Sequence, residues 1–159
     1  MNASIKFIVI IIFSLVTHLS YADNRISLLK ITGKVQISSD MKNWIVVTKP
    51  QKIENKTWLK TGKSGSVVLV LPDRTQTKVT RNSKLFLEKK PKKKQTINLK
   101  LGKIWAKTNK IPVKISLKSP NAVASIRGTE WVSEVKADGS SIIALLEGKV
   151  SIASNNNKN

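Results

Sequence analysis

Two polar side chains in one short segment are the clearest candidates for chemistry in this sequence. Residues 126–131 read Ile-Arg-Gly-Thr-Glu-Trp, which places Arg127 three residues before Glu130. The planar guanidinium of arginine can bind a carboxylate or a phosphate through two parallel hydrogen bonds. The segment runs straight into an apolar stretch, however, and this favours a structural role. In that interpretation Gly128 permits a tight bend, and Arg127 ties backbone carbonyls or Glu130 across neighbouring strands.

Most nucleophilic catalysis and most zinc sites in proteins need cysteine or histidine, and both are scarce in this sequence. It contains no cysteine and one histidine, His18, which falls inside the export signal described below. Removal of that signal excludes serine–histidine and cysteine–histidine nucleophiles and the usual zinc sites. Nine acidic residues could still supply the two carboxylates that glycoside hydrolysis needs. We therefore expect no enzymatic activity, metal or cofactor, and a carbohydrate-directed enzyme is the weaker alternative.

The first 22 residues predict a cleavable secretory signal peptide. Lys6 precedes an apolar run over residues 7–16, and Ser20-Tyr21-Ala22 places small residues at the two positions that signal peptidase reads. A retained membrane anchor is the alternative, but the run is well short of the roughly 20 residues that cross a bilayer. We expect cleavage after Ala22, no transmembrane segment afterwards, and a periplasmic or secreted protein.

The rest of the chain has the length of one domain and a strongly basic composition. We expect the domain over residues 23–153 and a polar C-terminal tail over residues 154–159. The whole sequence has 29 basic and 9 acidic residues and a net charge of +20, which attracts polyanions. Lysine supplies 25 of the 29 basic residues, and its flexible point charge suits non-specific attraction better than bidentate recognition.

The densest basic cluster lies at residues 89–94, which read Lys-Lys-Pro-Lys-Lys-Lys. Proline interrupts strand pairing and like charges repel one another, so a solvated hairpin tip between two strands is the favoured interpretation. Contact with an anionic cell-envelope polymer is the alternative, and export argues against nucleic acid as the partner. The candidate contact residues are Lys89, Lys90, Lys92, Lys93 and Lys94.

From residue 25 onward, short runs rich in β-branched residues alternate with turn residues, and no sustained helical periodicity interrupts them. This spacing predicts an all-β fold, specifically a curled two-sheet or twisted β-solenoid-like domain of about twelve short strands. The expected strands are residues 26–32, 34–38, 44–48, 66–71, 76–80, 84–88, 96–101, 103–108, 113–118, 130–136, 140–146 and 149–153.

Three similar Gly-Lys steps recur at Gly33, Gly102 and Gly148. Glycine adopts positive φ at low cost, so we expect a strand to end at each glycine and the next to begin after the lysine. The four tryptophans could stack on sugar rings if several faced outward together, but tryptophans spread through short strands are more often core anchors. They are Trp44, Trp58, Trp105 and Trp131.

Segments along nearly the whole mature chain resemble the FecR domain family in order and spacing. They are residues 33–35, Trp44, residues 58–62, 64–71, 72–75, 82–85, 119–124, 126–131 and 146–150. The most specific of them is the arginine-glycine-threonine-glutamate-aromatic signature, formed here by Arg127, Gly128, Thr129, Glu130 and Trp131. Two positions depart from the family pattern: Arg74 replaces the usual glycine, and Trp131 is larger than the usual aromatic residue.

The resemblance implies an all-β fold and a non-catalytic binding role outside the cytoplasm. The iron-transport regulators of this family carry a cytoplasmic sigma-factor-binding segment and a membrane helix before the domain, and we expect no anti-sigma activity here because this sequence shows neither. An envelope protein is the expected partner, and adhesion to an anionic envelope polymer or polysaccharide is the alternative. The sequence leaves the oligomeric state open.

Overall fold

The computed structural model describes residues 25–90, 94–108 and 115–154, and these residues form strands and turns without a helix. The all-β prediction is therefore confirmed, and no membrane-spanning helix occurs in the described part of the chain. The strands are β1 (Ile26–Thr32), β2 (Val35–Ser38), β3 (Ile45–Val46), β4 (Gln51–Ile53), β5 (Thr57–Thr61), β6 (Ser66–Val70), β7 (Gln76–Val79), β8 (Lys84–Lys90), β9 (Lys94–Lys107), β10 (Ile115–Lys118), β11 (Ala122–Val135) and β12 (Ser141–Ser154).

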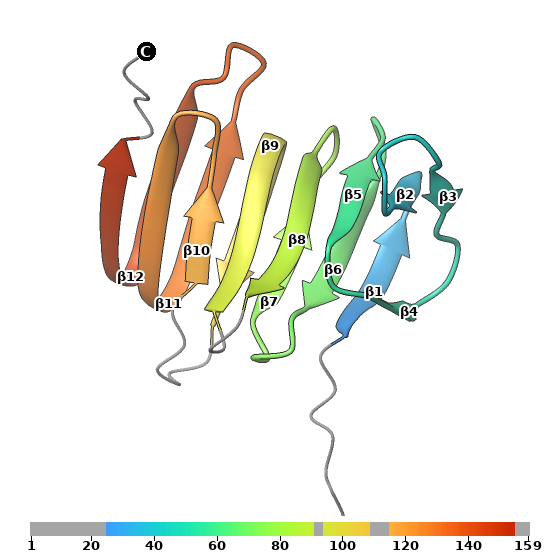
Figure 1. Cartoon of the computed structure of the whole chain (residues 1–159), viewed down its shortest axis with the longest axis horizontal. Coiled ribbons are helices and arrows are strands. Elements are labelled where there is room, and N and C mark those ends of the chain that lie inside the picture. The colour runs from blue at the N-terminus through green and yellow to red at the C-terminus, as the bar shows by residue number, and fades with distance from the viewer. Residues whose placement is uncertain (1–24, 91–93, 109–114, 155–159) are drawn as a thin grey trace, which may run out of the picture.

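The strands form one continuous sheet that folds back on itself into two layers (Figure 1). The sheet folds over along β9. The first half of β9 pairs with β8 and β10, and its second half pairs with β7 and β11. Layer I contains β3, β2, β5, β8, the first half of β9, β10, the first half of β11 and the second half of β12. Layer II contains β4, β1, β6, β7, the second half of β9, the second half of β11 and the first half of β12.

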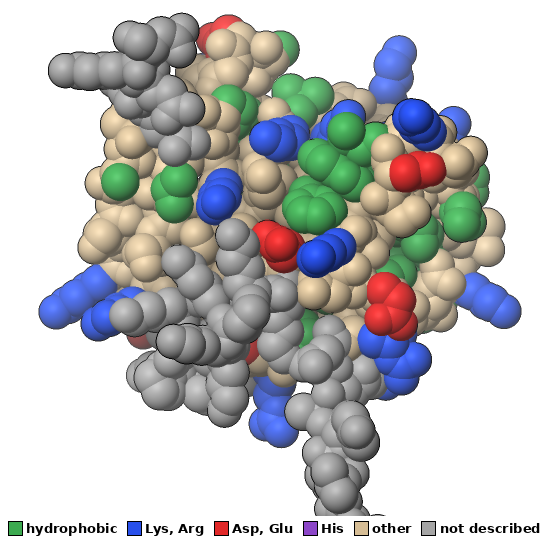
Figure 2. All heavy atoms as spheres, in the orientation of Figure 1, with side chains coloured by type: hydrophobic (Ala, Val, Ile, Leu, Met, Phe, Trp, Pro, Cys, Tyr) green, Lys and Arg blue, Asp and Glu red, His purple; other side chains and the backbone are tan. Residues whose placement is uncertain are grey.

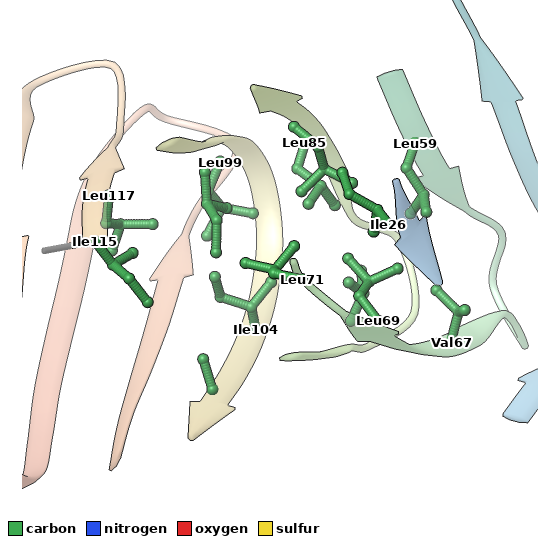
Figure 3. Packing of buried hydrophobic residues seen from close by; sticks show 14 of the residues in the cluster. Ile26, Leu59, Val67, Leu69, Leu71, Leu85, Leu99, Ile104, Ile115 and Leu117 are labelled. Atoms are coloured by element: carbon green, nitrogen blue, oxygen red, sulfur yellow. The ribbon is translucent and has the colours of Figure 1, made fainter. Parts of the chain in front are cut away.

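Alternation of apolar and polar residues directs one face of each layer toward the other. In β8, for example, Leu85 and Leu87 are buried while Lys84 and Glu88 are half-exposed. Leu59, Leu85 and Leu99 of layer I point toward side chains of layer II, as Figure 3 shows. Close packing of these inner faces is the main source of stability in a chain without disulfides.

The chain crosses between the layers at bends, and the three Gly-Lys steps lie at such crossings. Gly33, Gly102 and Gly148 all have positive φ, at +59°, +92° and +114°. Only at Gly33 does a strand end, as predicted. The expected strand ends at Gly102 and Gly148 were wrong, because β9 and β12 continue through these glycines as long bent strands. At each of them a register shift in the neighbouring ladder accommodates the bend.

Two short strands and half of a long one were missing from the sequence prediction. β4 and β5 are lysine-containing segments of three and five residues, and they become strands by pairing with β1 and with β2 and β8. The first half of β11 begins Ala-Val-Ala-Ser, which has little strand propensity of its own. It is held between β10 and β12. Pairing with neighbouring strands, and not local sequence preference, therefore makes these three segments strands.

The bend at Gly102 packs directly on the neighbouring crossing at Ser83. The backbone N–H of Ser83 donates to Thr61 Oγ1 at 2.9 Å, and that hydroxyl donates to the carbonyl of Thr80 at 2.6 Å. A Cβ built on Gly102 would lie 2.5 Å from the Cα of Ser83 and would overlap its Oγ. Glycine is therefore required here both for its positive φ and for the close approach of the two crossings.

The substitution Gly102→Ala should destabilise the protein by about 3 kcal/mol, combining a positive-φ penalty with overpacking. Gly139→Ala is the matched control, because Gly139 has φ of +82° but no atom within 4 Å of the position that a Cβ would take. That control should cost about 1 kcal/mol from backbone strain alone. Urea unfolding of both variants measures the difference, and equal losses would contradict the packing of Gly102 on Ser83.

Candidate functional site

Aromatic and cationic side chains gather on the outer face of layer I. We call this group the aromatic–lysine patch, and it consists of Trp44, Trp58, Lys60, Lys84 and Phe86. The ring centroids of Trp58 and Phe86 lie 4.9 Å apart, Lys60 Nζ lies 3.8 Å from the ring centroid of Trp44, and Lys84 Nζ lies 5.6 Å from that of Trp58. Hydrophobic side chains among lysines are visible on the face in the region of β5 and β8 (Figure 2).

Strand alternation and register build most of the patch. In β5 the side chains of Thr57, Leu59 and Thr61 point inward and are buried, so Trp58 and Lys60 point outward. The antiparallel ladder with β8 then sets Trp58 opposite Phe86 and Lys60 opposite Lys84. Directly opposed side chains lie close enough to interact, and an aromatic pair such as Trp58 and Phe86 stabilises the sheet by roughly 0.2–1 kcal/mol. The opposed lysines repel each other, and each lies near a tryptophan ring instead.

Trp44 comes from the loop between β2 and β3, and Asp40 holds that loop in shape. Asp40 Oδ1 accepts hydrogen bonds from the backbone N–H groups of Lys42 and Asn43, both at 2.8 Å, and from Ser38 Oγ at 2.9 Å. Trp44 Nε1 donates to the carbonyl of Met41 at 2.9 Å. The hydrogen bond from the Asn43 backbone, followed by that from Lys42, lowers the pKa of Asp40 well below its usual value of 3.8.

The patch has the chemistry of a binding surface for an apolar partner that carries negative charge. Its five side chains are half-buried and held by one another, so docking would cost little additional side-chain entropy. Cation–π contacts at exposed sites contribute about 0.5–1 kcal/mol each and become stronger when water is excluded. Tryptophan and phenylalanine are also enriched at protein interfaces.

The signature residues of β11 lie elsewhere, at the bend between the two halves of that strand. Arg127 is exposed, and a register shift separates it from Glu130. Glu130 Oε1 accepts a hydrogen bond from Trp105 Nε1 at 2.9 Å, and Glu130 Oε2 forms an ion pair with Lys107 Nζ at 3.3 Å. Trp131 is fully buried in the core. Trp105 and Lys107, which contact Glu130, both lie on β9. The side chains of Gly128 and Thr129 lie outside the described residues.

The four tryptophans thus occupy three environments. Trp131 is a core residue, Trp105 is half-buried on the outer face of layer II, and Trp44 and Trp58 share the patch on layer I. The expectation of a core anchor therefore holds for Trp131. Sequence reasoning could not place the other three, because their faces depend on the strand register.

The strands on either side of the lysine cluster at residues 89–94 form an antiparallel pair, as the predicted hairpin requires. β8 ends and β9 begins there, with Lys90 opposite Lys94 in an antiparallel ladder. Lys89 is opposite Gln95 in the same ladder, whereas Lys92 and Lys93 lie outside the described residues. The cluster is therefore at the far end of β8 from Lys84.

An open groove of about 840 Å³ runs along the crossings on the side of layer II. Its basic lining residues are Lys63, Lys78, Arg81 and Lys103. Glu134 is the acidic residue in the lining, and it forms an ion pair with Lys103 Nζ at 2.8 Å. The groove therefore offers positive charge to an anionic polymer, but it does not hold the two carboxylates that glycoside hydrolysis requires.

Comparison with known proteins gives one match to a family. Residues 57–151 match the family described as FecR protein, a stretch that runs from the start of β5 to within three residues of the end of β12. No curated protein and no solved structure matches the chain. The matched residues include Trp58, Lys60, Lys84 and Phe86 of the patch and the whole signature segment.

The substitution Asp40→Asn should loosen the loop that carries Trp44 and should remove a pH dependence. Because folding lowers the pKa of Asp40, its contribution to stability is complete well above pH 3.8 and is lost as the pH falls below that value. The stability difference between the wild type and the variant should therefore be largest near neutral pH and should shrink in acid. Unfolding measured between pH 3 and 7 tests this.

The matched control is Asp138→Asn, in the turn between β11 and β12. The hydrogen bond from the Ser140 side chain lowers the pKa of Asp138, so this variant should also change the acid dependence of stability. It should leave the indole N–H resonance of Trp44 unshifted, whereas Asp40→Asn should shift it. A Trp44 resonance that responds equally to both variants would show that Asp40 does not position Trp44.

Proposed function

The chain belongs to the FecR family, and from this premise we propose that it is an exported, non-catalytic binding module whose partner is a protein of the cell envelope. FecR proteins are envelope-associated sensing and regulatory modules. The predicted signal peptide at residues 1–22 supports export of this chain. The family membership supports the absence of catalysis, and the aromatic–lysine patch supports a protein as the partner.

The observation that carries the proposal is the packing within the patch. The rings of Trp58 and Phe86 pack against each other on an outer face, with centroids 4.9 Å apart, and Lys60 and Lys84 lie beside them. A small group of aromatic side chains usually supplies most of the binding energy of a protein interface, and surrounding polar residues exclude water. The patch has this composition and is presented by two paired strands of a rigid sheet.

Adhesion to an anionic envelope polymer is the second candidate function. It is supported by the net charge of +20 and by the four basic side chains that line the groove. The two candidates use different forces and opposite layers. Recognition through the patch depends on apolar contact, whereas adhesion depends on exposed charge that salt screens.

The distinguishing experiment is capture from envelope extract at low and high salt with the purified exported protein as bait. We expect one protein to remain bound at about 0.5 M salt, where exposed charges are largely screened. Trp58→Ala should weaken its retention more than tenfold, as expected for a central aromatic contact. The matched control, Trp105→Ala, removes a half-buried tryptophan from the outer face of layer II and should leave retention unchanged.

Circular dichroism first establishes that both variants are folded. If high salt releases all bound material, and Lys63→Ala together with Lys78→Ala reduces binding while Trp58→Ala does not, the polymer is the ligand and the patch is not the binding site.

A further inference from the structure

The last strand of the sheet is a long unpaired edge. β12 spans 14 residues and pairs with β11 alone among the described strands, so its other side lies at the end of both layers, at the left in Figure 1. The edge strands at the opposite end of the sheet are β3 and β4, which have only two and three residues. A short edge gives little support to pairing with another chain, whereas a long one is a ready template.

The apolar side chains of β12 leave the core open at this end. Ile143, Leu145 and Val150 are partly buried against the core, and they are the outermost apolar residues of its inner faces. Ile152 also faces inward, opposite Ala124, yet it is 57% exposed. Leu146 is 61% exposed beside the bend.

The charged side chains of β12 sum to zero. The strand contains one lysine, Lys149, and one glutamate, Glu147, although the chain as a whole carries a net charge of +20. Proteins commonly protect a long edge with lysine, proline or a very short strand, and β12 has little of this protection. A second copy of this highly basic protein therefore meets less repulsion at β12 than it would at an edge rich in lysine.

The bend at Gly148 restricts how a second copy can pair with this edge. The first arm of β12 belongs to layer II and the second arm to layer I, with the crossing at Gly148. Antiparallel pairing along both arms requires a two-fold axis through the bend. The first arm of each copy then lies beside the second arm of the other, and each layer of one copy continues into the opposite layer of its partner.

The side chains match in the register that this axis imposes. The ladder with β11 shows that Ile143 and Leu145 face inward in the first arm and that Val150 and Ile152 face inward in the second. With the same bulge at Leu146, Leu145 is placed opposite Val150 of the second copy and Ile143 opposite Ile152. These pairs occur twice across the axis and close the open end of the core.

The charges also match in this register. Glu147 and Lys149 flank Gly148 and share the outer face, since they are opposite Glu130 and Arg127 of β11. The two-fold axis therefore places Glu147 of each copy opposite Lys149 of the other. Opposed ion pairs stabilise a sheet, whereas like charges directly opposite each other destabilise it.

We propose that the protein forms a two-fold symmetric dimer through antiparallel pairing of β12 with β12 of a second copy. About a dozen main-chain hydrogen bonds, four inner-face apolar pairs and two ion pairs form across the axis. The dimer turns two open sandwiches into one continuous sandwich whose remaining edges are the short strands β3 and β4.

The dimer has a consequence for binding that rests on the proposed function. The two-fold axis exchanges the layers, so the aromatic–lysine patches of the two copies face opposite directions at the two ends of the assembly. The dimer would then bridge two partner molecules, and linked binding of this kind exceeds the affinity of a single patch. Dimerisation itself does not depend on the patch, because β12 lies beyond β9, β10 and β11 from it.

Sedimentation equilibrium of the exported protein, with charge reversals at the bend, tests the proposal. Lys149→Glu should weaken dimerisation about tenfold, since both ion pairs become like-charge contacts, and Glu147→Lys should do the same. The double variant, which exchanges the two residues, should restore the wild-type dissociation constant. A mixture of the two single variants should also restore it, through formation of heterodimers.

A second variant tests the apolar pairs independently of charge. Ile152→Lys replaces an exposed side chain, so the monomer should stay folded, but it places a charge in the closed core of the dimer and should abolish dimerisation. Lys136→Glu, in the turn before β12, is a control of equal charge change to Lys149→Glu and should leave the dissociation constant within twofold.

Three outcomes would overturn the proposal. One is a monomer at every concentration up to about 1 mM, where even a weak specific contact is populated. Another is a dimer that Ile152→Lys leaves intact. The third is a failure of the charge-exchanged double variant to recover when both single variants are weakened. The two proposals can fail separately: a monomeric protein whose partner capture is still weakened by Trp58→Ala contradicts the dimer alone, whereas a dimer whose partner capture is unchanged by Trp58→Ala contradicts the proposed function alone.

Discussion

The structure depends on the bends that carry the chain from one layer to the other. A long strand can contribute to two facing layers only if its backbone turns sharply while its inward side chains stay inward. At Gly102 this requires a positive φ and a close approach to Ser83 that a Cβ would prevent. Because β9 bends there, its two halves join the layers, and the apolar faces of β5, β6 and β8 meet in one core.

The same alternation that fills the core also determines what the outer faces present. Leu59 and Leu85 point inward, so Trp58, Lys60 and Phe86 point outward from the same two strands. Packing of the core thereby holds the patch in place, and binding would not require the sheet to rearrange. In β11 the buried Trp131 and the outward Glu130 show the same division, and there Glu130 binds Trp105 and Lys107 on the neighbouring strand.

Local patterns in the sequence predicted the fold class, most strands, the hairpin at residues 89–94 and the family. They could not show whether a glycine ends a strand, because Gly33 and Gly102 share positive φ and the difference lies in which strands pair beside them. The sequence could not predict the patch either, because the contact between Trp58 and Phe86 depends on the register between β5 and β8. One signal was present in the sequence: Ser38, Asp40 and Asn43 have the spacing of a side-chain-capped turn, which positions Trp44.

The outer face of layer I, and not that of layer II, is the surface that we propose meets the envelope partner. Site-specific photo-cross-linking in intact cells tests this most directly, with a photoreactive phenylalanine derivative at Phe86 in layer I or at Lys78 in layer II. We expect a covalent adduct with one envelope protein from position 86 and none from position 78. Adducts of equal yield from both positions, or from position 78 alone, would contradict the assignment of the partner to layer I.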